Sequence, residues 1–160
     1  MTVTDKDMGW QALGEAVAEL GDSDSFVLVG IQGSEGSATH GADEMTNVGL
    51  GTIHEFGLGV PRRSFIRDAI DAHQDELAEF MGVLGQRVLL GDSHPSGPMS
   101  ETQALGLIGQ QAVKLIQQRI TAHIPPPLSE VTKKIKGSDV PLVRFGTLRK
   151  SITYKVGGSS

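Results

Sequence analysis

The sequence contains no cysteine among its 160 residues, so disulfide bridges, thiolate metal sites and thiol redox chemistry are excluded. Aromatic residues make up only 4% of the chain. Leu, Ile, Val and Met must therefore supply most of the core, and the few phenylalanines are expected to act as its large anchors. These anchors are Phe26, Phe56, Phe65, Phe80 and Phe145.

Long apolar runs and an excess of positive charge are also missing. No stretch approaches the roughly 20 apolar residues of a membrane helix, and the N-terminus lacks the pattern of a signal peptide, so we expect a soluble protein that does not bind membranes. The net charge is -5, whereas nucleic-acid-binding domains concentrate Lys and Arg, so we expect no sequence-specific binding of DNA or RNA. The length and the 38% hydrophobic content predict one domain spanning residues 1–160.

The first third of the chain predicts a helix, a strand and a loop. Apolar residues three and four apart predict a helix from Met8 to Leu20. The β-branched run from Phe26 to Ile31 predicts a buried strand. Residues 32–45 are rich in small turn formers and have no period, so we expect a flexible loop. A short helix is predicted from Thr46 to Phe56.

Two long helices are predicted to form a hairpin. A stripe of apolar residues predicts one helix from Phe65 to about Leu90. Residues 91–98 contain two prolines and two glycines and should turn the chain. Ser100 and Gln103 form the capping-box pattern of a second helix that continues to about Thr121.

The C-terminal part predicts a change of direction and a second strand. Pro125 to Pro127 should end the second long helix, and residues 128–135 are expected to make one or two helical turns. The alternation from Ser151 to Val156 predicts a strand with one buried face, followed by a flexible tail at 157–160. We therefore expect an α+β fold with a small antiparallel sheet packed against the helical hairpin, plus the N-terminal helix.

One candidate for catalysis is Gly-Asp-Ser at 91–93, which resembles the nucleophile block of an esterase family. Such enzymes need an Asp-x-x-His downstream to activate the serine, but only His123 follows and no Asp lies three residues before it. Asp92 and Ser93 are also common turn residues. A small serine hydrolase using Ser93 is therefore kept as an alternative to a chain without catalytic residues.

Metal and cofactor sites are not expected. His54-Glu55 resembles the start of a zinc-protease signature, but Leu58 occupies the place of the second histidine. Gly33 to Gly36 lacks the Lys-Ser/Thr of a phosphate-binding loop. The other histidines have no ligand spacing: His40, His73, His94 and His123.

Two clusters of charge flank the start of the first long helix. Its acidic face is expected to be solvated and comprises Asp68, Asp71, Asp75, Glu76 and Glu79. The basic cluster comprises Arg62, Arg63 and Arg67. These arginines could pair with the acidic face of a neighbouring subunit or with acidic residues of their own helix, and the sequence does not choose between the two.

The stretches Ile-His-Glu-Phe-Gly at 53–57, Pro-Arg-Arg-Ser-Phe-Ile-Arg at 61–67 and residues 141–156 carry a family likeness. With them the chain resembles the tail-completion, or head-tail joining, proteins of long-tailed bacteriophages. The family pattern is followed at His54, Glu55, Phe56, Gly57, Pro61, Arg63, Phe65, Pro141, Leu142, Gly146, Leu148, Ser151 and Ile152. The chain departs from it at Arg62 and Ser64, and at Arg144-Phe145 where the family has Asp-Thr.

The retained residues also have physical roles that do not depend on the family. Pro61 should fix the approach to the following helix, and Phe65 should anchor the core. Gly146 can adopt a turn conformation that other residues rarely adopt. Leu148 and Ile152 should pack apolar side chains against the sheet.

The resemblance implies a structural, non-enzymatic protein of the virion neck or tail end, present in the host cytoplasm during assembly. It implies a ring of six copies around the DNA channel that contacts the head connector or adaptor and the tail terminator or tail tube. The acidic net charge would let DNA slide without sticking.

Such a protein needs segments that dock on neighbours, and we expect this of loop 32–45 and tail 157–160. The predicted interface residues are Gln32, Gly33, Ser34, Glu35, Gly36, His40, Asp43, Arg62 and Arg63. A generic adaptor that binds another protein through the glycine-rich loop is a further alternative.

Overall fold

The structure is a computed structural model that describes residues 14–18, 21, 23–38, 45–122, 124, 125, 127 and 146–158. Its elements in chain order are β1 (Phe26–Ile31), α2 (Gly33–Ser37), α3 (Asn47–Phe56), α4 (Arg67–Asp71), α5 (Gln74–Leu90), a 3-10 turn (Gly91–Ser93), α6 (Glu101–Thr121), α8 (Thr147–Lys150) and β2 (Ile152–Gly157). Residues 14–18, within the predicted N-terminal helix, are helical. The helical turns predicted at 128–135 lie outside the described residues.

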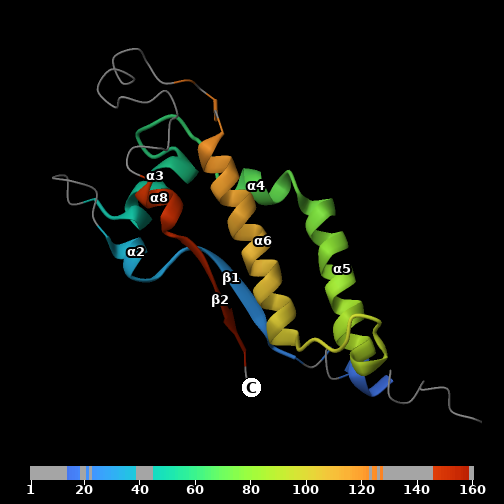
Figure 1. Ribbon diagram of the computed structural model, residues 1–160. Coiled ribbons are helices and arrows are strands. Elements are labelled where there is room, and N and C mark those ends of the chain that lie inside the picture. Colours follow the sequence, from blue (N-terminus) through green and yellow to red (C-terminus); the bar gives the residue numbers. More distant parts are fainter. Residues whose placement is uncertain are drawn as a thin grey trace, which may run out of the picture.

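The described elements form three layers in the order sheet, α6 and α5 (Figure 1). Strands β1 and β2 pair antiparallel, with Phe26 opposite Gly157 and Ile31 opposite Ile152. Helix α6 lies over one face of this sheet, and α5 packs along α6 as the second arm of a hairpin. The predicted α+β fold and its helical hairpin are therefore confirmed.

Local sequence signals explain why α6 starts where it does and how it reaches the sheet. The Ser100 side chain accepts a hydrogen bond from the Gln103 amide and the Gln103 side chain accepts one from the Ser100 amide, so the predicted capping box is confirmed. Further along, a Cβ atom at Gly109 would lie 2.5 Å from the ring of Tyr154 and 2.9 Å from the Val27 side chain. Glycine at this position therefore lets the helix backbone approach both strands.

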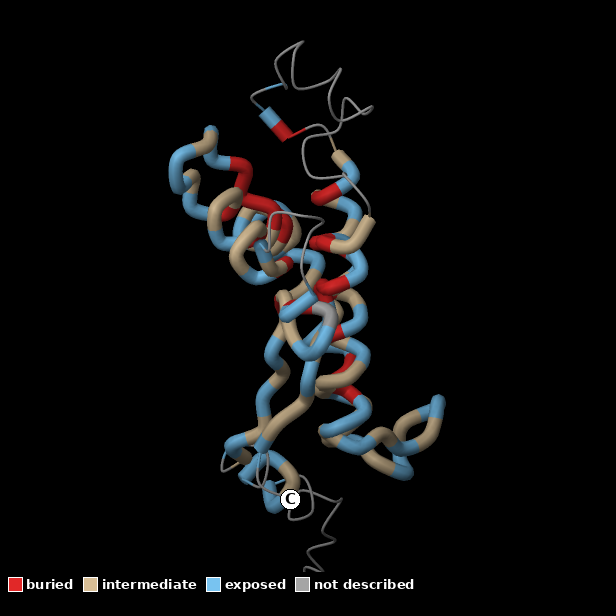
Figure 2. The backbone as a smooth tube through the Cα atoms, turned by 90° about the vertical axis from the view of Figure 1, so that its left-hand side faces the viewer, coloured by how far each residue is buried: buried red, intermediate tan, exposed pale blue. Residues whose placement is uncertain are grey.

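The core lies where α3, α4, α8 and the C-terminal half of α6 meet, and Figure 2 shows buried positions gathered in the upper half of the molecule and continuing down one long helix. It consists of Phe65, Ala69, Ile116, Ile120, Ile124, Leu148 and Ile152. Phe65 is fully buried, as predicted. The anchor role predicted for Phe26 and Phe56 is wrong, because these side chains are 47% and 58% exposed. Phe80 is half-buried, and Phe145 lies outside the described residues.

The loop predicted at 32–45 is wrong in its first part, where α2 forms instead. Its stabilisation is tertiary: Gly36 is buried, and a Cβ there would lie 3.2 Å from the Val48 side chain and 3.3 Å from that of Ile31. Two glycines in five residues give a weak local helix signal, which explains the error. The tail predicted from Gly157 also begins too early, because this residue belongs to β2.

The single long helix predicted from 65 to 90 is interrupted between α4 and α5. At the break, the backbone of His73 leaves the helical region with φ -125 and ψ 23, and its Nδ1 atom lies 2.8 Å from the Ala69 carbonyl oxygen. A second difference is α8, which separates the Gly146 turn from the last strand. Gly146 itself has the left-handed conformation expected of it, with φ 69.

Candidate functional site

The best-defined polar cluster of the described residues surrounds the side chain of Glu55. Helix α3 ends at Phe56, and Gly57 follows in the left-handed conformation with φ 73. The chain then doubles back, so that residues 64–67 run past the last turn of α3. Glu55 is only 8% exposed in this arrangement.

Four donors converge on the two carboxylate oxygens of Glu55. Ser64 Oγ donates to Oε1 at 2.6 Å, and the Arg67 amide donates to the same oxygen at 3.1 Å. The Phe65 and Ile66 amides donate to Oε2 at 2.8 and 3.0 Å. These amides lie at the start of α4 and have no partner within that helix, so Glu55 caps the helix from outside. We call Glu55 with residues 64–67 the Glu55 cap.

The carboxylate of the Glu55 cap is held in its charged form. Burial alone raises the pKa of Glu55, while the hydrogen bonds from Ser64 and the backbone amides of residues 65–67 lower it. The net effect places the pKa below its ordinary value of 4.5. The dipole of the helix that it caps also favours a negative charge there.

Neighbouring residues close the turn between α3 and α4. The Arg63 amide donates to the His54 carbonyl oxygen at 2.8 Å, and Arg63 is only 5% exposed, which lowers the pKa of its guanidinium group. A Cβ at Gly57 would lie 2.9 Å from the Arg62 Cβ, so glycine is required by space as well as by φ. The two N-terminal stretches of the family pattern therefore fold into one unit.

The C-terminal stretch of the pattern packs against the same unit. Leu148 and Ile152 are each 2% exposed and share a cluster with Phe65. Ser151 Oγ donates to the Leu148 carbonyl oxygen at 2.7 Å, which fixes the turn between α8 and β2. Pro141 and Leu142 lie outside the described residues.

Some of the predicted interface residues are exposed and others are buried. Gly33, Ser34 and Arg62 are exposed, and Gln32 is half-buried with its Nε2 atom donating to the Leu28 carbonyl. In contrast, Gly36 and Arg63 are buried, which leaves little of either for a partner to contact. Helix α2 contains Glu35, while His40 and Asp43 lie outside the described residues.

The acidic face predicted along α4 and α5 is mostly exposed. Asp68 forms an ion pair with Arg119 of α6 at 3.1 Å, and Glu76 accepts a hydrogen bond from Gln111 of α6. These contacts fasten the α4–α5 arm to α6. Exposed pairs of this kind contribute little to stability.

The residues around Ser93 do not form a catalytic arrangement in the described part of the chain. Ser93 is exposed in the 3-10 turn, and the neighbouring His94 Nδ1 accepts from the Ser96 amide at 3.1 Å. No hydrogen bond joins Ser93 to a histidine or carboxylate among the described residues, and His123 lies outside them. Nor do the described residues contain a group of His, Asp and Glu able to hold a metal ion.

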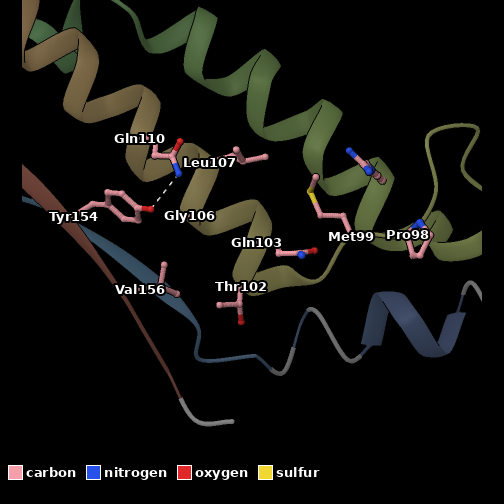
Figure 3. Close-up of a pocket in the computed structure, with 10 residues that line it drawn as sticks. Pro98, Met99, Thr102, Gln103, Gly106, Leu107, Gln110, Tyr154 and Val156 are labelled. Carbon is pink, nitrogen blue, oxygen red and sulfur yellow. Dashed lines mark hydrogen bonds between the residues drawn. The ribbon is translucent and has the colours of Figure 1, made fainter.

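An open groove of about 590 Å³ lies between α6, β2 and the loop that joins α5 to α6 (Figure 3). Met99, Leu107 and Val156 supply apolar surface, and Tyr154 Oη accepts from Gln110 Nε2 at 3.2 Å. The charged group at its end, Arg87, already donates to the carbonyl oxygens of Ser96 and Gly97. Its side chain therefore stabilises the α5–α6 loop.

Sequence reasoning assigned Glu55 to a motif but missed its capping role. The signal lies in α3, whose buried positions are Asn47, Gly51 and Glu55. They are four residues apart, so they share the inward face of the helix. A glutamate on that buried face needs hydrogen-bond donors, because burying an unpaired carboxylate is costly, and the backbone amides after Pro61 provide them.

No family model, curated protein or solved structure matches this chain. Among the helices in the described ranges, none combines the length and the apolar character required to cross a bilayer.

Proposed function

We propose that the protein is a structural component of the virion of a long-tailed bacteriophage, where it joins or completes the tail at the head-tail interface. In this proposal it forms a ring of six around the DNA channel and contacts the head connector or adaptor on one side and the tail terminator or tube on the other. The resemblance in the sequence is the source of this assignment.

The observation that carries the proposal is the Glu55 cap. Residues that follow the family pattern hold this unit together: Glu55 accepts a hydrogen bond from the Phe65 amide, and the Arg63 amide donates to the His54 carbonyl oxygen. Phe65 packs in the core, whereas Phe56, which also follows the pattern, is exposed. The pattern therefore describes a scaffold in which the only buried carboxylate of the described residues caps a helix. A protein that functions by docking needs such a rigid scaffold, because the surfaces that its partners bind must be held in fixed positions.

The charge of the chain supports the same assignment. A net charge of -5 disfavours lasting contact with the phosphate backbone of DNA that passes through a channel.

The proposal is tested by placing a stop codon early in the gene of the phage that encodes the chain. We expect DNA-filled heads and separate tails in electron micrographs, and joined particles again when the wild-type chain is supplied from a plasmid. Supplying the Ser93→Ala variant should restore joining equally well, because the proposed role involves no nucleophile. Normal infectious particles without the protein would refute the assignment, whereas failure of Ser93→Ala despite normal folding would favour the hydrolase.

A further inference from the structure

The two-stranded sheet has one face that no described element covers. Side chains alternate between the faces of a strand, and Val27 and Tyr154 point toward Gly109 of α6. Phe26 and Leu28 therefore point away, and they are 47% and 52% exposed. We call this the open sheet face: Phe26, Leu28, Thr153 and Lys155, all exposed. Figure 2 views the molecule from the sheet side and shows alternation of exposed and half-buried positions along both strands.

A second uncovered surface lies on the opposite side of the molecule, on α5. Leu84 is the buried residue of this helix, and at 100° per residue the positions across from it form the outer face. The outer face of α5 comprises Asp75, Ala78, Glu79, Gly82, Val83 and Gln86, all exposed.

Gly82 leaves one position on the outer face of α5 without a side chain. Glycine in a helix interior is unfavourable relative to alanine, yet a Cβ added to Gly82 would meet nothing within 4 Å. No contact among the described residues compensates for this cost. Together with Ala78 it gives this face two small residues one turn apart, next to Val83, whose side chain is 56% exposed.

We propose that the open sheet face of one copy docks on the outer face of α5 of the next copy. Phe26 and Leu28 are exposed apolar side chains of the sheet, and the small residues Ala78 and Gly82 leave room for them beside Val83. The polar residues are complementary too, because Lys155 stands opposite Leu28 in the register of the open sheet face, whereas the helix offers Asp75 and Glu79.

Charge also selects this pairing over the symmetric ones. No ion pair joins Lys155, Asp75 or Glu79 to another residue in the described ranges. Two open sheet faces placed together would bring lysines close to each other, and two outer faces of α5 would bring carboxylates together. Only the mixed pairing sets opposite charges against each other.

The two faces lie on opposite sides of the sheet–α6–α5 stack (Figure 1). Docking one on the other therefore continues the layers from copy to copy, and such a head-to-tail contact closes into a ring when the rotation between copies allows it. The inference rests on the proposed ring and names the surfaces that form it.

The first test measures self-association of the full-length chain by sedimentation velocity over a concentration series. Lys155→Glu and Glu79→Lys should each weaken association roughly 10-fold, because each sets like charges against each other. The double variant Lys155→Glu/Glu79→Lys should recover most of the loss. Lys114→Glu, at an exposed position of α6, makes the same change in net charge as Lys155→Glu but lies outside both faces, so it should have little effect.

The second test uses the absence of cysteine in the native chain. Lys155→Cys and Glu79→Cys are made as separate variants and treated with a short bis-maleimide. We expect cross-linked dimers when the two variants are mixed and none when either is treated alone. Cross-linking of either variant with itself would show a symmetric contact and overturn the proposal.

Failure of the docking surfaces is distinguishable from failure of the proposed function. A chain that stays monomeric up to its solubility limit overturns the docking proposal, as does a ring in which the mixed variants do not cross-link. Neither result affects the phage experiment above. Conversely, normal particles without the protein refute the neck assignment even if the cross-link forms.

Discussion

Removal of the Glu55 carboxylate tests whether this side chain organises the fold. In Glu55→Ala, Ser64 Oγ and the Phe65 amide lose their acceptor in buried surroundings, while the Ile66 and Arg67 amides are only partly buried. Each fully buried donor left without a partner costs about 1 to 3 kcal/mol, and water can satisfy the other two in part. We therefore expect the free energy of unfolding to fall by roughly 2 to 6 kcal/mol.

The isosteric variant Glu55→Gln separates charge from shape. It keeps one acceptor oxygen but directs an amide NH2 group at backbone donors, so it should lose about 1 to 3 kcal/mol at pH 7. The pKa of Glu55 is lower in the folded chain than its ordinary value of 4.5, so the wild type has its full stabilisation above that value and loses it as the pH falls through the folded pKa. The difference in stability between wild type and Glu55→Gln should therefore shrink as the pH drops below about 4.5.

Urea denaturation followed by far-UV circular dichroism measures both effects. Asp71→Asn is the matched control, because Asp71 is exposed on α4 and has no hydrogen bond among the described residues. It should change stability by less than about 0.5 kcal/mol at any pH. If Glu55→Ala is as stable as this control, or if the Glu55→Gln difference stays constant from pH 7 to pH 3, the capping argument fails.

Four further substitutions test other parts of the structure by the same denaturation assay. Phe65→Ala should lower stability by roughly 3 to 5 kcal/mol because the ring is fully buried, and a loss below about 1 kcal/mol would contradict that burial. Gly109→Ala should lower it by about 1 to 3 kcal/mol, since the new methyl group meets the ring of Tyr154. Gly106→Ala, whose nearest contact would be 3.8 Å away, should be neutral or stabilising, and equal losses at both glycines would refute the close approach of α6 to the sheet. Ser93→Ala, at an exposed turn position, should stay within about 0.5 kcal/mol of wild type, and a larger loss would show an unrecognised contact.

Elements that depend on nearby residues were predictable from the sequence. The capping box at Ser100 and Gln103 fixes the start of α6 without reference to the rest of the fold. The β-branched strand at 26–31 is equally local and is present in the structure, but it is exposed at Phe26 and Leu28, so the prediction that it is buried was wrong there. These sequence signals act without contacts to residues that are distant in the chain.

Elements that depend on distant contacts were missed. Helix α2 forms where Gly36 packs against Ile31 and Val48, which a loop-like composition conceals. The break after α4 occurs at His73, where neither Pro nor Gly marks it. The His73 side chain also contacts the Ala69 carbonyl oxygen, and the spacing of apolar residues does not predict such a contact.

The candidate site shows the same division. The sequence identified Glu55 as part of a motif, but its role depends on a chain reversal that brings residues 64–67 to the end of α3. Burial of Phe26 was predicted from residue type alone, yet its strand places it on the face away from α6. Which face is covered is decided by the packing of the helices and not by the strand itself.

The pairing of β1 with β2 has a consequence for biosynthesis. Residues 26–31 leave the ribosome well before their partner strand at residues 152–157, so the two strands can pair only after all the residues between them have been synthesised. Until then the side of α6 around Gly109 faces water, and its apolar neighbours are exposed to chaperones and to other unfinished chains. Translation that stops before residue 152 should yield an aggregation-prone product.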